Sequence, residues 1–190
     1  MTLSVADAKQ PFPNRLHGTY DLVHLRLLVS AMTRDEWAIV AYHAVSLLKP
    51  GGWIQWEEPD LWNVRVLRDK VDSQTDNLAR LSAYWADAMG EKFLYGFSTL
   101  PAIYQRLGLV DVREDVVASD RLLHNRVLCA RVTAEGVIRM SRKRAAEGAP
   151  GSFSLQQLDQ LERAVKRDFD TGAYTRYDMF IIMGRRPLLD

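Results

Sequence analysis

An α/β fold is predicted by two short apolar runs that flank a helix-forming segment. The first run, Tyr20–Leu25, is compact and largely apolar, as in strands buried on both faces of a parallel sheet. The second run, Trp53–Trp56, follows the turn residues Pro50, Gly51 and Gly52. A strand, a helix and a second strand in this order form a crossover unit, and such units build parallel sheets.

The helix between these runs has a start signal and an apolar stripe. Thr33 and Glu36 match a capping box, in which the threonine hydroxyl accepts a hydrogen bond from a backbone N–H and the glutamate reaches back. We therefore expect a helix that starts near Thr33 and stops at Pro50. Apolar residues recur along it at helical spacing: Trp37, Ile39, Val40, Ala44, Val45, Leu47 and Leu48.

The rest of the chain continues the alternation of helices and strands. We expect further helices over residues 69–90, 96–107 and 154–172, and further strands over residues 3–6, 109–117 and 174–183. The last of these helices opens with a second capping box, formed by Ser154 and Gln157. The basic run Arg139–Arg144 is more typical of a solvated helix face than of a site for phosphate or a partner.

Composition and charge limit the kinds of partner and site. The chain has 190 residues, of which 47% are hydrophobic, so we expect one domain with its own core. The net charge of +1 gives no general attraction for nucleic acid or a membrane, and a small-molecule partner fits better. The single cysteine, Cys129, favours a reducing compartment, and the histidine spacing predicts no metal site. Because we find neither a signal peptide nor an apolar run of about 20 residues, we expect a soluble, cytoplasmic protein.

Two motifs carry a resemblance to a known family. They are the run Tyr20–Arg26, with the sequence YDLVHLR, and the run Leu47–Glu58, with the sequence LLKPGGWIQWEE, with Trp37 between them. At this spacing they closely resemble the middle of class I S-adenosylmethionine-dependent methyltransferases, above all the fungal branch associated with secondary metabolism. In that family the first run is the fourth strand, and Lys-Pro-Gly-Gly is the turn into the fifth. The resemblance covers residues 2–60 by motif and the later strands by pattern.

The resemblance implies an incomplete Rossmann-like class I methyltransferase sheet. Residues 1–190 would be a single methyltransferase-like domain, the C-terminal two-thirds of the fold, and residues 121–172 would be a helical lid or insertion before the last strand. The family's glycine-rich loop would precede Leu3 and is missing, and Gly51-Gly52 cannot replace it because that pair enters a strand. The strand at Tyr20 would then have an unpaired apolar edge, which a homodimer or a partner chain would cover.

The resemblance also places candidate site residues. Asp7 and Ala8 stand where the family has an aspartate-alanine pair whose carboxylate accepts a hydrogen bond from the adenine amino group. Without cofactor, Asp7 would instead cap a turn. His24 and Arg26 would lie at the carboxyl end of the fourth strand, where open α/β sheets bind ligands.

The chemistry of these residues leaves alternatives open. His24 would be a general base or a hydrogen-bond donor to substrate, or else a histidine packed between strand and helix. Arg26 would hold a carbonyl or anionic group, or form a salt bridge with Glu57 or Glu58. Two adjacent glutamates after a strand point to opposite sides, so we expect at most one to face a pocket and the other to be solvated.

Aromatic residues are candidates for a flat, apolar substrate. Trp56, Trp62 and Trp85 are the predicted substrate-binding residues, and Trp53 and Tyr84 belong to the same set. Packing in the core is the more common role of such side chains.

Three functions follow from this reasoning. The leading hypothesis is an enzyme of natural-product biosynthesis that acts on a small apolar substrate without S-adenosylmethionine, by cyclisation, a pericyclic step, isomerisation or elimination. The second is an S-adenosylmethionine-dependent O- or N-methyltransferase whose N-terminal cofactor half is missing or supplied by a partner. The third is a non-catalytic regulator of secondary metabolism.

Overall fold

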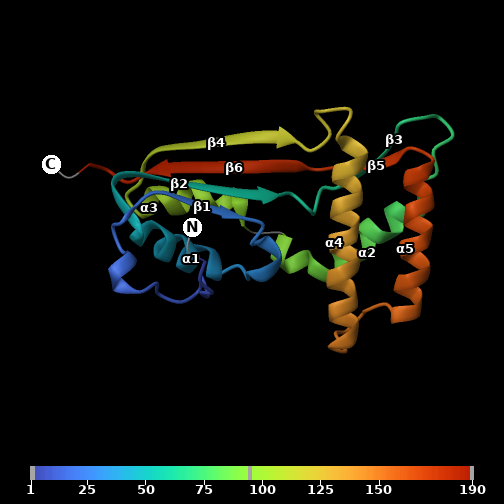
Figure 1. Cartoon of the computed structure of the whole chain (residues 1–190), viewed down its shortest axis with the longest axis horizontal. Helices are drawn as coiled ribbons and strands as arrows, with labels where there is room; N and C mark the ends of the chain where they lie inside the picture. Colours follow the sequence, from blue (N-terminus) through green and yellow to red (C-terminus); the bar gives the residue numbers. More distant parts are fainter. Residues whose placement is uncertain (1–2, 94–95, 189–190) are drawn as a thin grey trace. The chain divides into compact units, whose positions relative to one another are not determined.

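The computed structural model describes residues 3–93 and 96–188 and divides the chain into two compact units. Unit 1 is made of residues 1–59, 91–117 and 179–190, and unit 2 of residues 60–90 and 118–178. We expected one domain with an insertion at residues 121–172. The second unit is larger than this insertion, because residues 60–90 belong to it as well (Figure 1).

Unit 1 contains a mixed sheet, which confirms the α/β class. Its strand order is β1-β2-β6-β4, with β1 at one edge. β1 and β2 are parallel, as the crossover motif predicts, whereas β6 pairs with β2 in the antiparallel direction. The strands are β1 (Tyr20–Arg26), β2 (Leu48–Pro59), β4 (Val110–Ala118) and β6 (Asp178–Arg185).

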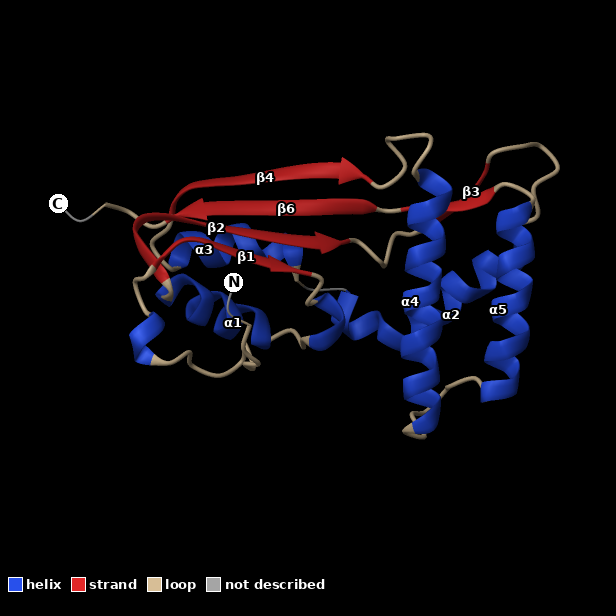
Figure 2. Ribbon diagram, viewed as in Figure 1, coloured by secondary structure: helices blue, strands red, loops and turns tan. Residues whose placement is uncertain are grey.

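Two helices, α1 (Glu36–Ser46) and α3 (Leu100–Arg106), lie on one side of this sheet (Figure 2). The ring of Trp37 from α1 stacks on Trp56 from β2, with centroids 5.3 Å apart. Alternation along β2 gives the reason, since Ile54, Trp56 and Glu58 are buried and the residues between them are half-buried. The described part of the unit also contains the short 3-10 helices η1 (Asn14–Leu16), η2 (Val29–Ala31) and η3 (Phe97–Thr99).

The expected burial of β1 on both faces is wrong. Tyr20 is 40% exposed and Leu22 is 57% exposed. Leu22 pairs with Trp53, so its side chain lies on the face of the sheet opposite Trp56, the residue on which α1 packs. Among the described residues, β1 has a neighbouring strand on one side only. On that paired side the backbones approach closely. A Cβ at Gly52 would lie 3.0 Å from the carbonyl oxygen of Tyr20, so a side chain there would push the backbones of β1 and β2 apart.

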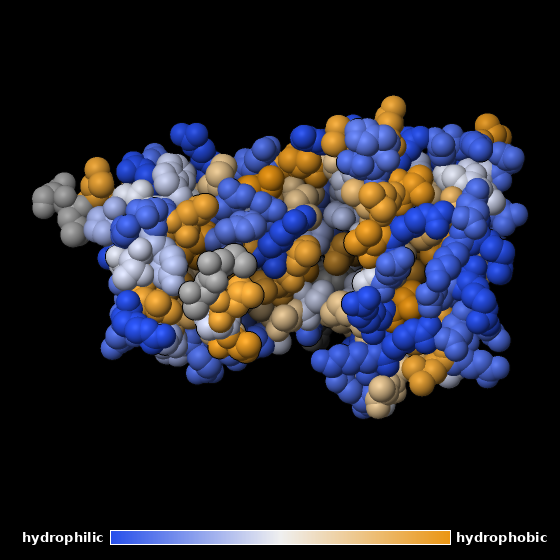
Figure 3. Space-filling view, in the orientation of Figure 1, coloured by the Kyte–Doolittle hydropathy of each residue, from blue (hydrophilic) through white to orange (hydrophobic). Residues whose placement is uncertain are grey.

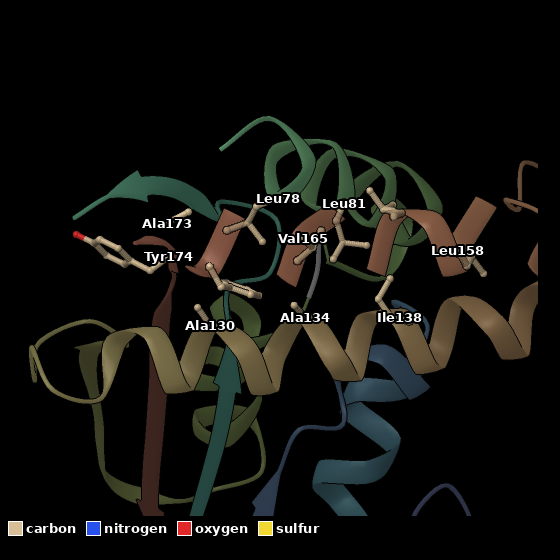
Figure 4. Packing of buried hydrophobic residues seen from close by; sticks show 11 residues of the cluster. Leu78, Leu81, Ala130, Ala134, Ile138, Leu158, Val165, Ala173 and Tyr174 are labelled. Atoms are coloured by element: carbon tan, nitrogen blue, oxygen red, sulfur yellow. The ribbon is translucent and has the colours of Figure 1, made fainter. Parts of the chain in front are cut away.

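Unit 2 packs helices around a small sheet. Its core joins residues of α2, α4, α5 and β5 (Figure 4). β3 and β5 form an antiparallel pair. The elements are β3 (Arg65–Arg68), α2 (Asp76–Phe93, of which residues 76–90 belong to this unit), α4 (Arg126–Ala146), α5 (Leu155–Asp170) and β5 (Ala173–Arg176). On the face seen in Figure 3 the surface over α5 is mostly hydrophilic, as expected for a helix with one apolar stripe.

A buried aspartate of α5 holds the start of α2. Asp168 accepts hydrogen bonds from the backbone N–H groups of Asn77 and Leu78, each at 2.9 Å. Its other carboxylate oxygen accepts from the Asn77 side-chain amide at 2.9 Å. The first N–H groups of a helix have no partner within the helix, so Asp168 acts as the cap of α2 from another helix.

Several predicted boundaries need correction. Residues 3–6 form no strand, and the helix expected from residue 69 begins at Asp76. The first capping box is half formed: Thr33 N–H donates to Glu36 at 2.7 Å, but the helix starts at Glu36 with no side-chain cap. The Ser154 capping box is confirmed, with both hydrogen bonds present.

The expected strand over residues 174–183 is divided between β5 of unit 2 and β6 of unit 1. Residues 121–148, which the sequence left open, contain the long helix α4. Within residues 3–93 and 96–188, no helix is long and apolar enough to cross a membrane.

Candidate functional site

The carboxyl ends of β1 and β2 bring together three of the predicted site residues. His24 Nε2 lies 3.2 Å from Glu57 Oε1, and Arg26 Nε lies 3.3 Å from Glu57 Oε2. Gln55 also donates to Glu57 Oε1, at 2.6 Å. We call His24, Arg26, Gln55 and Glu57 the Glu57 cluster.

Strand pairing explains why these side chains meet. Arg26 is the Cα partner of Glu57 in the parallel ladder, and His24 is the partner of Gln55. Residues two apart in a strand share a face, so all four side chains lie on one side of the sheet. The side chain of Glu57 is 17% exposed, whereas those of His24 and Arg26 are 47% and 55% exposed. The largely buried carboxylate of Glu57 thus holds two solvent-accessible hydrogen-bond donors, the imidazole of His24 and the guanidinium of Arg26.

The salt bridge predicted for Arg26 is confirmed, and its partner is Glu57. The expectation that the second glutamate is solvated is wrong. Glu58 is 0% exposed and points to the opposite face, where its carboxylate accepts hydrogen bonds from the backbone N–H groups of Leu28 and Val29 and from the indole of Trp56. Burial raises the pKa of Glu58, while these hydrogen bonds act in the opposite direction.

Glu58 therefore has a structural role at the end of β1. The chain turns sharply there, since Leu27 has a φ of 59° and its N–H donates to the Glu57 carbonyl. The Glu58 carboxylate then receives the next two N–H groups, at 2.7 and 3.1 Å. This arrangement fixes the backbone that follows Arg26, and it needs a residue with two acceptor oxygens.

Asp7 and Ala8 fit the adenine role only in part. Asp7 is exposed and accepts a hydrogen bond from Lys9 N–H at 2.9 Å, which makes it a turn cap, as in the alternative expectation. The carbonyl of Ala8 lies 3.1 Å from His43 Nδ1. Gly51 and Gly52 lie inside β2 and do not join a strand to a helix. An exposed carboxylate suits an amino donor, but these residues alone do not surround a nucleoside.

The predicted aromatic residues lie in different places. Trp56 is completely buried between Trp37 and Glu58, so in this structure it packs in the core. In unit 2, Trp62 is 43% exposed and packs on Gly90, where an added Cβ would lie 3.1 Å from the ring. Trp85 is 3% exposed and lines a crevice of the same unit.

The basic run of α4 behaves as a solvated helix face with one strong cross-link. Arg142 forms ion pairs with Asp159 at 2.6 Å and Glu162 at 2.7 Å, both on α5. Hydrogen bonds from Lys166 and Arg142 lower the pKa of Glu162. These pairs tie α4 to α5 and leave no reason to assign a phosphate site to Arg142.

Two functional candidates were missed from the sequence. Gln55 was overlooked although it precedes Glu57 by two positions, the spacing that puts residues of a strand on one face. Thr175 lines the crevice beside Trp85. The sequence gives no sign of this position, because threonine is a common residue in strands.

Comparison with known proteins points to methyltransferases. No family model matches the sequence. Methyltransferase grgD of Penicillium sp is 53% identical over 59 residues, which are 30% of this chain and 21% of that protein. Methyltransferase psoC of Aspergillus fumigatus is 40% identical over 185 residues, and N-methyltransferase gliN of the same species is 26% identical over 195 residues. These two matches cover 94% and 96% of this chain, and 64% and 66% of the relatives.

The chain is therefore similar to fungal proteins named methyltransferases and spans about two thirds of the length of two of them. Among solved structures, a methyltransferase of Bacillus halodurans described as putative shares 12% identity with a TM-score of 0.46, over 96% of this chain and 76% of that one. The [4+2]-cyclase SpnF shares 16% identity with a TM-score of 0.46, over 98% and 56%. The names of the relatives do not support our expectation that no cofactor is used.

Proposed function

We propose that this chain carries the acceptor side of an S-adenosylmethionine-dependent methyltransferase, which acts on a nitrogen or oxygen atom of a small, largely apolar metabolite. The observation that carries the proposal is the Glu57 cluster at the carboxyl edge of two parallel strands. The similarity to proteins named methyltransferases supports the reaction class, and one of them is named an N-methyltransferase. The activity of the whole protein is part of this proposal, as is the cofactor.

Glu57 determines which ring nitrogen of His24 acts as the base. Because His24 Nε2 lies 3.2 Å from the carboxylate, the neutral ring holds its proton on Nε2 and presents the lone pair of Nδ1. That nitrogen takes the proton from the acceptor N–H or O–H, which makes the acceptor a better nucleophile. The Glu57 carboxylate then stabilises the imidazolium ion.

Arg26 and Gln55 complete the cluster. One guanidinium nitrogen of Arg26 faces Glu57 Oε2, and the others can donate to a carbonyl or carboxylate group of the substrate. Gln55 holds the shared carboxylate in place through its 2.6 Å hydrogen bond. The cofactor, when bound, supplies the methyl group, and Asp7 offers it one acceptor at the adenine amino group.

The first experiment measures cofactor binding and product together. Calorimetry with S-adenosylmethionine should show micromolar binding when this chain is joined by a segment that supplies the rest of the cofactor site, and mass spectrometry should then show a gain of one methyl group on a substrate. Turnover without cofactor binding would instead favour cyclisation, a pericyclic step, isomerisation or elimination, in which His24 and Arg26 act as hydrogen-bond donors. A non-catalytic regulator gives no product under either condition.

Variants of the cluster test the mechanism. His24→Gln should lower kcat by about 10²- to 10⁴-fold, the usual contribution of a general base. Glu57→Gln should lower kcat by about 10²-fold through misplacement of His24. His17→Gln is the matched control, because His17 bonds to the carbonyl of Phe12 and lies outside the cluster. Equal activity of His24→Gln and the wild type would rule out the base.

A further inference from the structure

The sheet of unit 1 has one face that is open to solvent in the described part of the chain. α1 and α3 lie on the opposite face (Figure 2), where Trp37 stacks on Trp56. The open face contains a groove with a volume of about 410 Å³, and Leu22 of β1, Trp53 of β2 and Met183 of β6 form its apolar floor. Sheets with parallel strands normally have both faces covered, so this groove is a candidate for contact with another segment.

Strand pairing places the three floor side chains next to one another. Leu22 is the Cα partner of Trp53, and Met183 is the partner of Gln55, which lies two residues from Trp53 on the same face. Leu22 is 57% exposed, and Trp53 and Met183 are half-buried. Single exposed apolar side chains are common on proteins, but a contiguous apolar patch is typical of an interaction site.

The dimensions of the floor match one α-helix. The floor extends across β1, β2 and β6, which corresponds to two strand spacings, or about 10 Å. An α-helix with its side chains is about 10–12 Å wide, so a single helix that runs along the strands covers this width. Ile181 of β6 pairs with Glu57 and continues the apolar floor on the same face, four residues along β2 from Trp53. Four strand residues span about 13 Å, which is a little more than two helical turns.

The charges around the groove define the polar side of such a helix. Arg113 of β4 lines the groove, is exposed and forms no ion pair with a described residue. The charges near it are already paired, Asp21 with Lys49 at 2.9 Å and Arg185 with Asp111 at 2.6 Å. An apolar stripe flanked by one carboxylate that faces Arg113 therefore complements this surface in both shape and charge.

The groove is continuous with the Glu57 cluster. Gln55 lines the groove and donates a hydrogen bond to Glu57 at 2.6 Å, and both residues lie on the open face. A helix in the groove would therefore shield one side of the cluster from water. The relatives psoC and gliN each contain a part that lies outside the region this chain matches, and such a part can supply the helix.

We propose that the groove over Leu22, Trp53 and Met183 docks an amphipathic helix with an acidic residue opposite Arg113, and that this helix comes from a segment of the kind that the relatives carry outside the matched region. The same contact forms when that segment is joined to the chain and when it is a separate partner. Its assignment to the cofactor site rests on the proposed function. The docking itself does not, because it requires neither S-adenosylmethionine nor His24.

Co-expression with a defined segment tests the proposal. The probe is the part of psoC outside its match to this chain, produced together with the full chain carrying an affinity tag. The wild-type chain should retain the probe during purification. In Leu22→Asp, the Kd of the complex, measured by dilution in analytical ultracentrifugation, should rise about 10-fold, as expected for the loss of one buried leucine. Leu128→Asp is the matched control, because Leu128 of α4 is 59% exposed and lies outside the groove, and its Kd should equal that of the wild type.

Two further variants separate the face of the sheet from its β1 edge. Met183→Asp changes β6, which lies beyond β2 from that edge, and should raise Kd as strongly as Leu22→Asp. Arg113→Glu should raise Kd about 2- to 5-fold, the range for one surface ion pair. Circular dichroism checks that each variant folds.

The outcomes also separate this proposal from the proposed function. A wild-type chain that does not retain the probe would refute the docking, as would an unchanged Kd in Leu22→Asp. A folded Met183→Asp that binds as tightly as the wild type would place the contact at the edge of β1 and also refute the docking in the groove. A complex that forms through the groove but binds no S-adenosylmethionine would refute the proposed function and leave the docking intact.

Discussion

Replacing Thr175 by valine should stabilise the protein. The two side chains have nearly the same shape, but valine has a methyl group where threonine has a hydroxyl. In the folded chain this hydroxyl is buried and has no partner among the described residues, whereas in the unfolded chain water satisfies it. The substitution therefore removes an unfavourable contribution to the folded state and leaves the packing of β5 unchanged.

The expected magnitude follows from the desolvation of one hydroxyl. A buried polar group without a partner costs about 1–3 kcal/mol, so the free energy of unfolding should rise by about 1–3 kcal/mol in Thr175→Val. For a chain of 190 residues, each kcal/mol shifts Tm by roughly 2–4 °C. The expected increase in Tm is therefore about 2–12 °C.

Thr133→Val is the matched control. It makes the same chemical change in the same crevice, but this hydroxyl donates to the Cys129 carbonyl and lies 3.2 Å from the Tyr177 hydroxyl. Its loss should lower the free energy of unfolding by about 0.5–1.5 kcal/mol. Urea denaturation of the two variants should therefore give changes of opposite sign. Destabilisation of Thr175→Val by 1 kcal/mol or more would mean that the hydroxyl has a partner, which refutes the reasoning.

Three further predictions concern buried carboxylates and the edge of the sheet. Asp168→Ala leaves the start of α2 uncapped and should lower the free energy of unfolding, measured in urea, by about 2–4 kcal/mol. Asp168→Asn, which keeps one acceptor oxygen, should lower it by about 1 kcal/mol. An unchanged free energy of unfolding in Asp168→Ala would contradict the capping role. The folded-state pKa of Glu58 is raised above 4.5, so its contribution to stability is complete below pH 4.5 and is lost as pH rises through the folded-state pKa. Glu58→Gln should flatten that part of the pH profile, and an identical profile would exclude Glu58 as its source. We also propose that a second copy of the chain covers the edge of β1, next to the exposed Leu22. Leu22→Lys should then lower the mass measured by analytical ultracentrifugation toward that of a monomer. A wild-type chain that sediments as a monomer would rule out this dimer.

The local parts of the fold were predictable from the sequence. The crossover from β1 through α1 to β2 follows from periodicity, and the Ser154 capping box marks the start of α5 within one residue. The predicted turn at Pro50, Gly51 and Gly52 is wrong, because α1 ends at Ser46 and these residues lie within β2. The division of the closing segment into β5 and β6 was not predictable. Both halves are rich in β-forming residues, and the partner of each half is distant in the sequence.

In the candidate site, the strand positions of the side chains were predictable, whereas the burial of Glu58 was not. Alternation along β2 placed Glu57 and Glu58 on opposite faces, and strand-end position selected His24 and Arg26. The burial of Glu58 could not be predicted, because its donors are backbone groups of a loop whose path depends on the tertiary fold. A charged residue is normally expected in water unless such partners are known.

The position of β6 in the sheet has a consequence for the order of folding. β6 lies between β2 and β4 and follows both of them along the sequence. During synthesis β4 therefore leaves the ribosome before the only strand that it pairs with in the described sheet. Such distant pairing slows folding, so a nascent chain that ends before residue 178 should expose β4 and depend on chaperones until β6 is released.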